Sequence, residues 1–250
     1  MLPSTITRGI FLAIAALVCA GAVDGTLRAA DDERPTLTVK PTEDFAVTGD
    51  GASPAWERAD WVMLRKREPA GPLPYEARFK VLYSPTGLYF LIDGTDAELT
   101  ATLRKDYAHL WEEDAFEVLL WPDERNVVYL EYQISPLNYE LILLIPYLAG
   151  DTSRGWRPWE YEGERRTRKA TRAIGGMKVS GAKITGWRAE FFLPYALFAP
   201  LQNVPPKPGT TWRANVYRLD SDNGQPTRWL WAPLTGRFHQ PDKFGTLVFE

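Results

Sequence analysis

Hydrophobic and polar residues alternate along most of the chain after residue 41, with the two-residue period of β-strands. The alternating segments are short, and glycine, proline, asparagine or aspartate residues separate most of them. We therefore expect strands at residues 78–83, 88–93, 115–121, 127–134, 141–147, 177–184, 187–193, 212–219, 228–231 and 246–249. One short helical turn is expected at residues 194–198. The pattern predicts an all-β fold, an antiparallel β-sandwich.

One hairpin is predicted from a turn motif. Residues 78–83 and 88–93 flank Ser84-Pro85-Thr86-Gly87, whose proline and glycine favour a tight turn.

The stretch from residue 110 to 123 combines an aromatic residue, acidic residues and a strand. Trp111 precedes three carboxylates, and the following strand carries Glu117 among apolar neighbours. An acidic side chain in an apolar strand costs free energy unless something pairs with it. A tryptophan just before a strand and a carboxylate within that strand are suited to binding a sugar. The C–H face of the sugar stacks on the ring, and its hydroxyls donate hydrogen bonds to the carboxylate. It is equally open at this point that Trp111 caps a core and that Glu117 pairs with a buried arginine.

Alternation extends this polar character to neighbouring strands. If the apolar residues face the core, one outer face of the sheet carries six polar side chains: Glu117, Glu131, Gln133, Arg213, Asn215 and Tyr217. This mixed-sign surface favours a neutral polyhydroxyl ligand over an ion. The other interpretation is a solvated face with salt bridges among Glu117, Glu131 and Arg213.

The N-terminus has the pattern of an export signal. Arg8 precedes an apolar run, and small residues form a cleavage motif near residue 22, with a second possible cut near residue 30. We expect a signal peptide at residues 1–22, a flexible leader at residues 23–40 and a single domain at residues 41–250. The one cysteine, Cys19, lies inside the signal, so no disulfide is expected. This predicts a secreted or periplasmic protein with no membrane anchor once the signal is removed.

Composition narrows the class of partner. The net charge of −3 argues against a nucleic-acid ligand, which favours a basic surface. The one basic run, residues 165–172, follows three glutamates and is expected to be a solvated face or loop. Ten tryptophans and eleven tyrosines are more typical of a surface that stacks on flat apolar ligands. An aromatic loop is expected at residues 151–163, because loops of this length are uncommon unless they have a function.

Several ordered segments resemble carbohydrate-binding modules of family 9, and more closely the secreted proteins that are similar to this family. The matching segments occur in the following order: GDGASPAWERADW, FKVLYSPTGLYFLIDGTD, LWEEDAFEVLLWPD, GWRAEFFLPYALF, GTTWRANVYRLD, WLWAPLT and FHQPDKFGTLVFE. Together they cover most of residues 50–250.

The resemblance implies a DOMON-like β-sandwich that holds the end of a sugar chain between two aromatic rings, above polar side chains of a sheet. Trp111 matches the first ring. The second falls at Phe238, where the family pattern has a tryptophan. Glu117 matches a ligand-binding acid, and Gln133 and Tyr217 lie where the family has other hydrogen-bonding side chains. The family can hold structural calcium, but no Asp-x-Asp spacing assigns a site here, so no cofactor is predicted.

The sequence thus predicts a non-catalytic carbohydrate-binding protein that supports polysaccharide breakdown, with glycoside hydrolases as expected partners. The expected ligand-binding residues are Trp111, Glu117, Gln133, Asn215, Tyr217 and Phe238. A glycoside hydrolase is the first alternative, since Glu117 and Glu131 on neighbouring strands, or Glu113 or Asp114, offer pairs of carboxylates. A b-type haem domain is the second. Its candidate axial ligands are Met63, Met177, His109 and His239.

Overall fold

The structure is a computed structural model that describes residues 34–67, 73–147, 155–224 and 226–250. Arg34–Glu250 forms one compact unit. The expected signal peptide at residues 1–22, its later cut near residue 30 and the first part of the expected leader lie outside the described residues, as does the start of the aromatic loop. Within the described ranges, no helix has both the length and the apolar character needed to cross a membrane.

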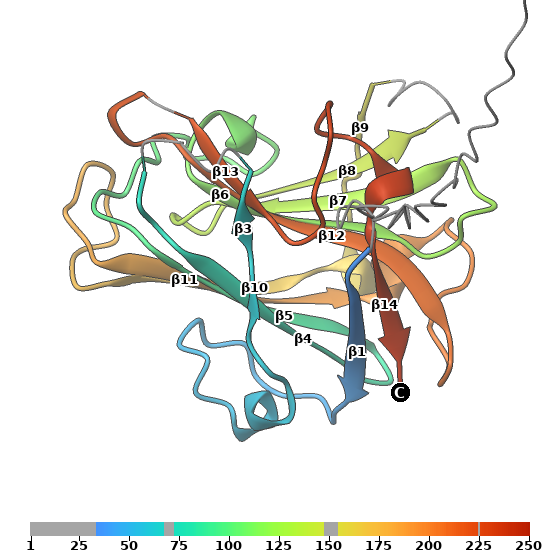
Figure 1. Cartoon of the computed structure of the whole chain (residues 1–250). Coiled ribbons are helices and arrows are strands. Elements are labelled where there is room, and N and C mark those ends of the chain that lie inside the picture. The colour runs from blue at the N-terminus through green and yellow to red at the C-terminus, as the bar shows by residue number, and fades with distance from the viewer. Residues whose placement is uncertain (1–33, 68–72, 148–154, 225) are drawn as a thin grey trace, which may run out of the picture. The chain divides into compact units, whose positions relative to one another are not determined.

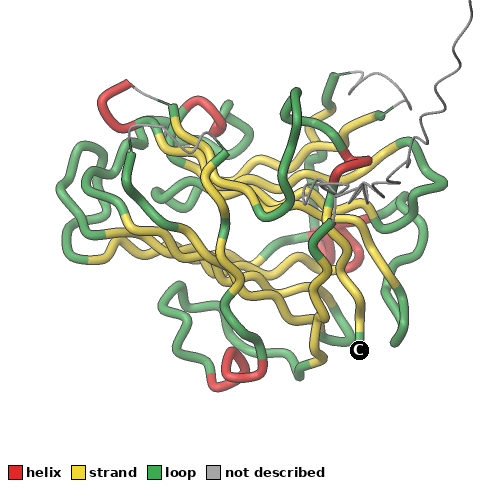
Figure 2. The backbone as a smooth tube through the Cα atoms, in the orientation of Figure 1, coloured by secondary structure: helices red, strands yellow, loops and turns green. Residues whose placement is uncertain are grey.

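The described residues form fourteen strands arranged as two facing sheets (Figures 1 and 2). The first sheet has the order β10-β11-β5-β4, and its strands are β10 (Arg168–Ile174), β11 (Gly186–Pro194), β5 (Gly87–Thr95), β4 (Ala77–Tyr83) and β2 (Val62–Met63), which pairs with β4. The second has the order β14-β12-β6-β7-β8-β9. Its strands are β14 (Gly245–Phe249), β12 (Thr211–Asp220), β6 (Ala115–Trp121), β7 (Val128–Ile134), β8 (Glu140–Pro146) and β9 (Arg157–Pro158).

Two further strands extend the second sheet, and one strand joins both. Strand β13 (Thr227–Leu230) pairs with β12 beyond the end of β14, and β3 (Arg65–Lys66) pairs with β13. Strand β1 (Thr36–Pro41) runs parallel to β14 at its start and parallel to β4 at its end. The predicted β-sandwich is therefore confirmed, with two parallel pairs at β1 in an otherwise antiparallel arrangement.

Helical structure in the described residues is limited to six 3₁₀ helices. They are η1 (Pro54–Arg58), η2 (Leu110–Glu112), η3 (Gly163–Arg165), η4 (Tyr195–Phe198), η5 (Asp222–Gly224) and η6 (Pro241–Lys243). The predicted turn at residues 194–198 corresponds to η4.

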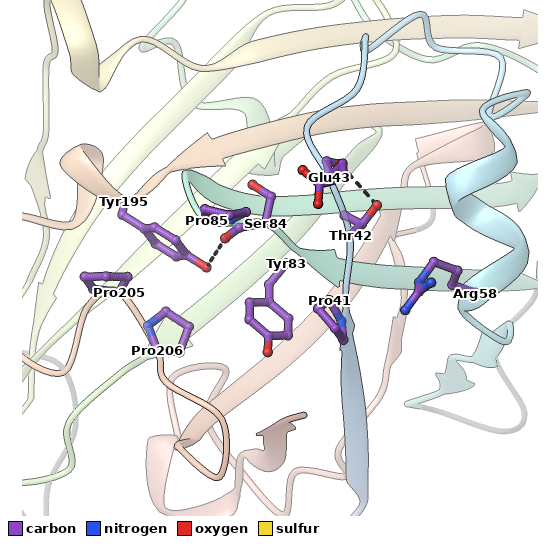
Figure 3. A pocket seen from close by; sticks show the side chains of 10 residues that line it. All are labelled: Pro41, Thr42, Glu43, Arg58, Tyr83, Ser84, Pro85, Tyr195, Pro205 and Pro206. Carbon is purple, nitrogen blue, oxygen red and sulfur yellow. Dashed lines mark hydrogen bonds between the residues drawn. The ribbon is translucent and has the colours of Figure 1, made fainter.

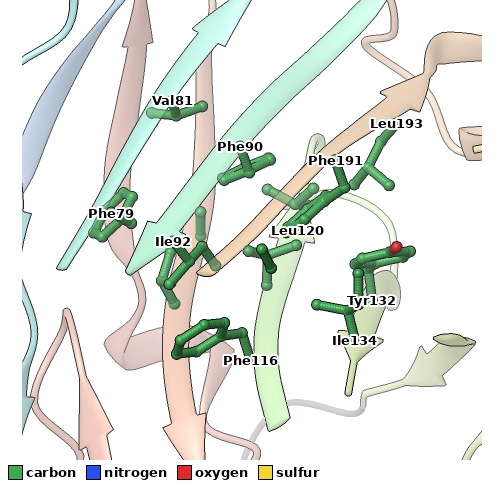
Figure 4. Packing of buried hydrophobic residues seen from close by; sticks show 14 of the residues in the cluster. Phe79, Val81, Phe90, Ile92, Phe116, Leu120, Tyr132, Ile134, Phe191 and Leu193 are labelled. Carbon is green, nitrogen blue, oxygen red and sulfur yellow. The ribbon is translucent and has the colours of Figure 1, made fainter. Parts of the chain in front are cut away.

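The core lies between the two sheets because alternate residues of each strand point inward. Figure 4 shows side chains of β4, β5 and β11 facing those of β6 and β7. The closest aromatic contact joins Phe116 of β6 and Trp187 of β11, whose rings stack with centroids 3.8 Å apart. Both side chains are fully buried, so this pair fastens one sheet to the other.

The predicted hairpin is confirmed as β4 and β5, and Ser84 N donates to Gly87 O at 2.9 Å to close its turn. Gly87 is required by space, since a Cβ atom there would lie 2.4 Å from the carbonyl oxygen of Leu193. The other expected strands correspond to β6, β7, β8, β11, β12, β13 and β14, with shifts of a few residues at their ends.

Two predictions about the strands were wrong. Residues 177–184 form turns and bends, in which Met177 is 70% exposed, and only Lys183 makes an isolated bridge, to Glu98. The strand that precedes β11 is instead β10, which was not predicted and falls mostly within the basic run 165–172. The arginines of this run are exposed, as expected for a solvated face, but most of the run forms a strand and not a loop. It is the edge strand of its sheet, where lysine and arginine protect the open edge. The predicted leader was also wrong at its end, since residues 36–40 belong to β1.

We expect Phe116→Ala to lower the free energy of unfolding by about 3–5 kcal/mol, because it leaves a cavity against Trp187. Denaturant unfolding of the purified protein measures this change. Met177→Ala, at an exposed position, is the matched control and should shift stability by less than about 0.5 kcal/mol. Equal effects of the two substitutions would contradict the placement of Phe116 between the sheets.

Candidate functional site

The polar side chains that alternation assigned to one face do lie together on the second sheet. In the strand register Glu117 stands opposite both Tyr217 and Gln133, and Leu119 stands opposite Asn215 and Glu131. Directly opposed residues of antiparallel strands point to the same side of a sheet. The predicted grouping of these residues is therefore confirmed.

This face is covered, not solvated. Leu119, Tyr129 and Leu143 on the same side form a second apolar cluster with Phe244, and Trp111 and Phe238 pack against it. Glu117 is 0% and Glu131 2% exposed. The interpretation as a solvated face with salt bridges was therefore wrong.

Arg213 takes no part in an ion pair with these two acids. It donates to Thr246 Oγ1 at 2.6 Å and lies 3.8 Å from Glu124.

An open cavity of about 450 Å³ lies over this face, between the sheet and the loops that cover it. The central strands contribute acidic and amide side chains to its lining. Strand β13 contributes Arg228, and the loops and η2 contribute aromatic rings and two further arginines. The lining residues are Arg67, Trp111, Glu117, Glu131, Gln133, Leu143, Trp156, Leu219, Arg228, Gly236, Arg237, Phe238 and His239.

The two rings that were expected to grip a ligand both line this cavity. Trp111 belongs to η2, is partly exposed, and stacks on His109 with ring centroids 4.3 Å apart. Phe238 comes from the segment between β13 and η6 and packs against Tyr217 at 4.5 Å. A third ring, Trp156, meets Trp111 edge-on at 5.7 Å. The cavity therefore offers aromatic surface from three separate segments.

Acidic and amide oxygens at this cavity lack hydrogen-bond partners within the described protein. Four oxygen atoms are buried without a hydrogen-bond partner: both carboxylate oxygens of Glu117, Oε2 of Glu131 and Oε1 of Gln133. The one bond among these side chains runs from Gln133 Nε2 to Glu131 Oε1 at 2.5 Å. A buried polar atom without a partner costs roughly 1–3 kcal/mol, which a ligand that donates hydrogen bonds would recover.

Burial also changes the protonation of this site. It raises the pKa of Glu117 well above the ordinary value, and the neighbouring charge of Glu131 adds to the effect. It raises the pKa of Glu131 to about 7, against the opposing hydrogen bond from Gln133. Burial lowers the pKa of His239 to about 4, so its imidazole is neutral at pH 7. The Nδ1 atom of His239 is hydrogen-bonded to the hydroxyl of Tyr129 at 2.7 Å.

Asn215 and Tyr217, which were expected to contact a ligand, lie behind the cavity lining. The Asn215 side chain donates to Ala232 O at 3.0 Å and accepts from Ala232 N at 2.8 Å. It also donates to the Tyr217 hydroxyl at 3.1 Å, which in turn donates to Phe238 O at 3.4 Å. These bonds use the polar atoms of both side chains to fasten the segment that carries Phe238 to β12.

Several cavity residues were not among those predicted from the sequence. Glu131 had been placed on the correct face and Trp156 falls within the expected aromatic loop, but neither was assigned to the site. His239 had been named only as a candidate haem ligand. The arginines carry no local sequence signal, because Arg67, Arg228 and Arg237 come from separate segments that only the folded chain brings together.

Three other acids could hold a cation. Asp96, Asp114 and Asp220 are buried, and one carboxylate oxygen of each lies within 4.8 Å of the others. Oxygen donors of this kind suit calcium, and their wide separation in the chain explains why no spacing motif indicated them. The guanidinium of Arg218, also fully buried, lies 3.2 Å from Asp96 and donates to Asp220. It provides positive charge to these acids within the fold.

A larger cavity of about 620 Å³ lies elsewhere, beside the ends of β1 and β4 (Figure 3). Its hydroxyls are bonded within the protein: Tyr195 donates to Ser84 O at 3.1 Å, and Tyr83 donates to Glu250 O. Among the described residues that line it, none has a buried polar side-chain atom without a partner. The smaller cavity is therefore the stronger candidate for a ligand site.

The structure gives no support to the haem alternative. Met63 and Met177 are 49% and 70% exposed, and neither lines the cavity to which His239 belongs.

Comparisons with known proteins find this fold in solved structures. No protein-family model matches the chain, and no curated protein matches it significantly. The structure is similar to that of a proposed carbohydrate-binding protein from Bacteroides uniformis, with a TM-score of 0.72 and 18% identity over 87% of this chain and 100% of that one.

It is also similar to a family 9 carbohydrate-binding module from Caldicellulosiruptor kristjanssonii. The complex with cellotriose has a TM-score of 0.60 at 16% identity and covers 86% of this chain and 93% of that one. The complex with glucose has a TM-score of 0.61 at the same identity and covers 86% and 95%. The fold that the sequence resemblance implied, that of family 9 carbohydrate-binding modules, is therefore confirmed.

We expect the raised pKa of Glu131 to make stability depend on pH. The folded state holds this proton up to about pH 7, while the unfolded state releases it near pH 4.5, so stability falls as the pH rises between these values. Glu131→Gln removes the contribution of Glu131 to this dependence and should stabilise the protein by on the order of 3 kcal/mol above pH 7 relative to the wild type. Denaturant unfolding from pH 4 to pH 8 measures the difference.

The control is Glu164→Gln at an exposed position of η3, which should leave the shape of the curve unchanged. Parallel curves for wild type and Glu131→Gln would show that Glu131 titrates normally.

Proposed function

We propose that this protein binds carbohydrate without modifying it, in the cavity between Trp111 and Phe238. The observation that carries the proposal is the set of buried acceptor atoms on Glu117, Glu131 and Gln133, beneath aromatic rings, that have no hydrogen-bond partner among the described residues. Sugar hydroxyls are donors and the C–H faces of pyranose rings stack on aromatics, so a sugar complements both parts of the lining. The glucose and cellotriose complexes of the structurally similar module support this class of ligand.

The cavity's form favours the end of a sugar chain. Its volume of about 450 Å³ lies in the range of small-molecule sites. Aromatic rings surround it from η2, from the residue immediately before β9 and from the segment before η6. The N-terminal export pattern supports secretion or a periplasmic location. In that setting a binding protein would serve polysaccharide breakdown beside glycoside hydrolases.

A glycoside hydrolase is the second candidate function, because Glu117 and Glu131 form a pair of carboxyl groups. Glu117 and Glu131 are diagonal neighbours on paired strands, a separation of the order that glycosidases use. Both side chains, however, emerge from one face of one sheet, whereas a glycosidase places its two carboxyls on either side of the scissile bond. Burial raises the pKa of both, so neither is an effective base below neutral pH.

We expect Trp111→Ala to lose about 1–3 kcal/mol of sugar binding, as other aromatic stacking platforms do, at a nearly unchanged melting temperature. Phe238→Ala should behave in the same way, and Phe238→Trp should keep or improve affinity. Calorimetric titration with the best ligand from a glycan array, together with thermal unfolding, measures both quantities.

Phe244→Ala is the matched control, because Phe244 is fully buried and packs on Tyr129. It should destabilise the fold by about 3–5 kcal/mol. If Trp111→Ala and Phe238→Ala instead lowered the melting temperature and left affinity intact, the rings would be core residues and the proposed site would be wrong.

We further expect no hydrolysis of xylan, glucan, mannan or pectin fragments by the purified protein, assayed as release of reducing ends. Sustained release that Glu117→Gln or Glu131→Gln abolishes would place the protein among the hydrolases.

A further inference from the structure

His239 lines the candidate sugar cavity and is hydrogen-bonded on one side to a buried tyrosine. Its side chain is 26% exposed, and its Nδ1 atom lies 2.7 Å from the hydroxyl of Tyr129. Tyr129 is 0% exposed and does not line the cavity. Among the described residues, Nδ1 of His239 is the only hydrogen-bond partner of this hydroxyl. The pair therefore joins the cavity lining to a buried side chain of β7.

The proton of the Tyr129 hydroxyl decides which nitrogen of His239 carries hydrogen. A buried hydroxyl proton needs an acceptor. Oε2 of Glu131, on the same strand, accepts no hydrogen bond from the described residues, so Nδ1 of His239 is the atom that accepts this one. A neutral imidazole that accepts at Nδ1 carries its hydrogen at Nε2. Nε2 points away from Tyr129 and has no hydrogen-bond partner among the described residues.

The two other protonation states of His239 do not fit this arrangement. If Nδ1 carried the hydrogen, it would donate to the Tyr129 oxygen, and the buried hydroxyl proton would have no acceptor among the described residues. A doubly protonated ring would have the same defect. It would also lie 3.7 Å from Glu131 Oε2, which is too far for a hydrogen bond. Burial lowers the pKa of His239 to about 4, which agrees with a neutral ring at pH 7.

We propose that His239 contacts the ligand and that its Nε2–H donates a hydrogen bond to an oxygen atom of the bound sugar. Tyr129 is a positioning residue that keeps this hydrogen at Nε2. The proposal rests on the proposed function and adds a donor to the unpartnered acceptors of Glu117, Glu131 and Gln133. Sugar hydroxyls both donate and accept, and the ring oxygen accepts. A donor on the covering segment and acceptors on the sheet would together fix the orientation of one sugar ring.

The first part of the test measures the tautomer of His239 in the purified protein at pH 7, without ligand. Long-range ¹⁵N–¹H NMR correlations show which ring nitrogen carries hydrogen. The chain has two histidines, and His239→Phe identifies the signals of His239 by their loss. We expect hydrogen at Nε2 alone in the wild type and a mixture of both neutral tautomers in Tyr129→Phe. Tyr195→Phe, which removes a hydroxyl at the other cavity, is the matched control and should leave His239 unchanged.

The second part measures affinity by calorimetric titration with glucose, galactose, xylose and cellotriose, and the melting temperature of each variant. His239→Phe keeps a ring without an N–H. It should weaken binding of the tightest of these sugars about threefold to tenfold, the range that one neutral hydrogen bond contributes. His239→Gln, whose amide nitrogen can take the position of Nε2, should remain within about twofold of the wild type. His239→Asn, whose shorter side chain places its amide nearer the position of Nδ1, should act like His239→Phe.

The outcomes separate this inference from the proposed function. Hydrogen at Nδ1 of His239 would overturn the inference whether or not a sugar binds, and unchanged tautomers in Tyr129→Phe would overturn the positioning role of Tyr129. Equal affinities of the wild type and His239→Phe, or equal losses in His239→Phe and His239→Gln, would overturn the contact and leave carbohydrate binding in place. Absence of binding to these sugars and to a glycan array would overturn the proposed function itself, and the contact with it.

Discussion

The two-residue period of strand β6 is the constraint on which the cavity depends. Phe116, Val118 and Leu120 point between the sheets, where Phe116 stacks on Trp187. Because side chains alternate along a strand, Glu117 and Leu119 must then lie on the outer face. A shift of one residue in the register would place Glu117 in the apolar core. The energy that holds the sheets together therefore also holds the acid in position, and the site is built on a rigid element.

On the outer face of the second sheet, polar side-chain atoms of Glu117, Glu131 and Gln133 are buried without hydrogen-bond partners among the described residues. Removal of the charged Glu117 and Glu131 side chains from water costs free energy. Burial raises the pKa of both groups for the same reason, because the protonated form is less costly to bury than the charged form. Asn215 and Tyr217 hold the covering segment over this face by hydrogen bonds to Ala232 and Phe238. These acceptors have no hydrogen-bond donor among the described residues, and a bound ligand would supply one.

The buried acids on the two faces of strand β12 have different partners. Near its C-terminal end, Arg218 is surrounded by Asp96 and Asp220 and also donates to Thr95 O at 2.5 Å. Those acids have a positive partner within the fold. One to three residues earlier along β12, Asn215 and Tyr217 stand opposite the row that contains Glu117. The charge of Arg228 lowers the pKa of Glu117 and so opposes the effect of burial, but the carboxylate oxygens of Glu117 accept no hydrogen bond from the described residues. Since a missing partner is costly, its retention at the cavity is better explained by ligand binding than by stability.

The sequence alone determined the fold class, most strands and which polar residues share a face, because these follow from local alternation and turn residues. It also indicated Trp111, Glu117, Gln133 and Phe238, which line one cavity. It misassigned β10, since the charged residues of an edge strand look like a loop when the neighbouring strand is unknown. Tertiary structure alone decided that the polar face is covered, that Asn215 and Tyr217 lie behind it, and that three arginines meet above it. Burial and the approach of segments more than 150 residues apart, such as Arg67 and Arg228, are properties of the folded chain, and no local pattern encodes them.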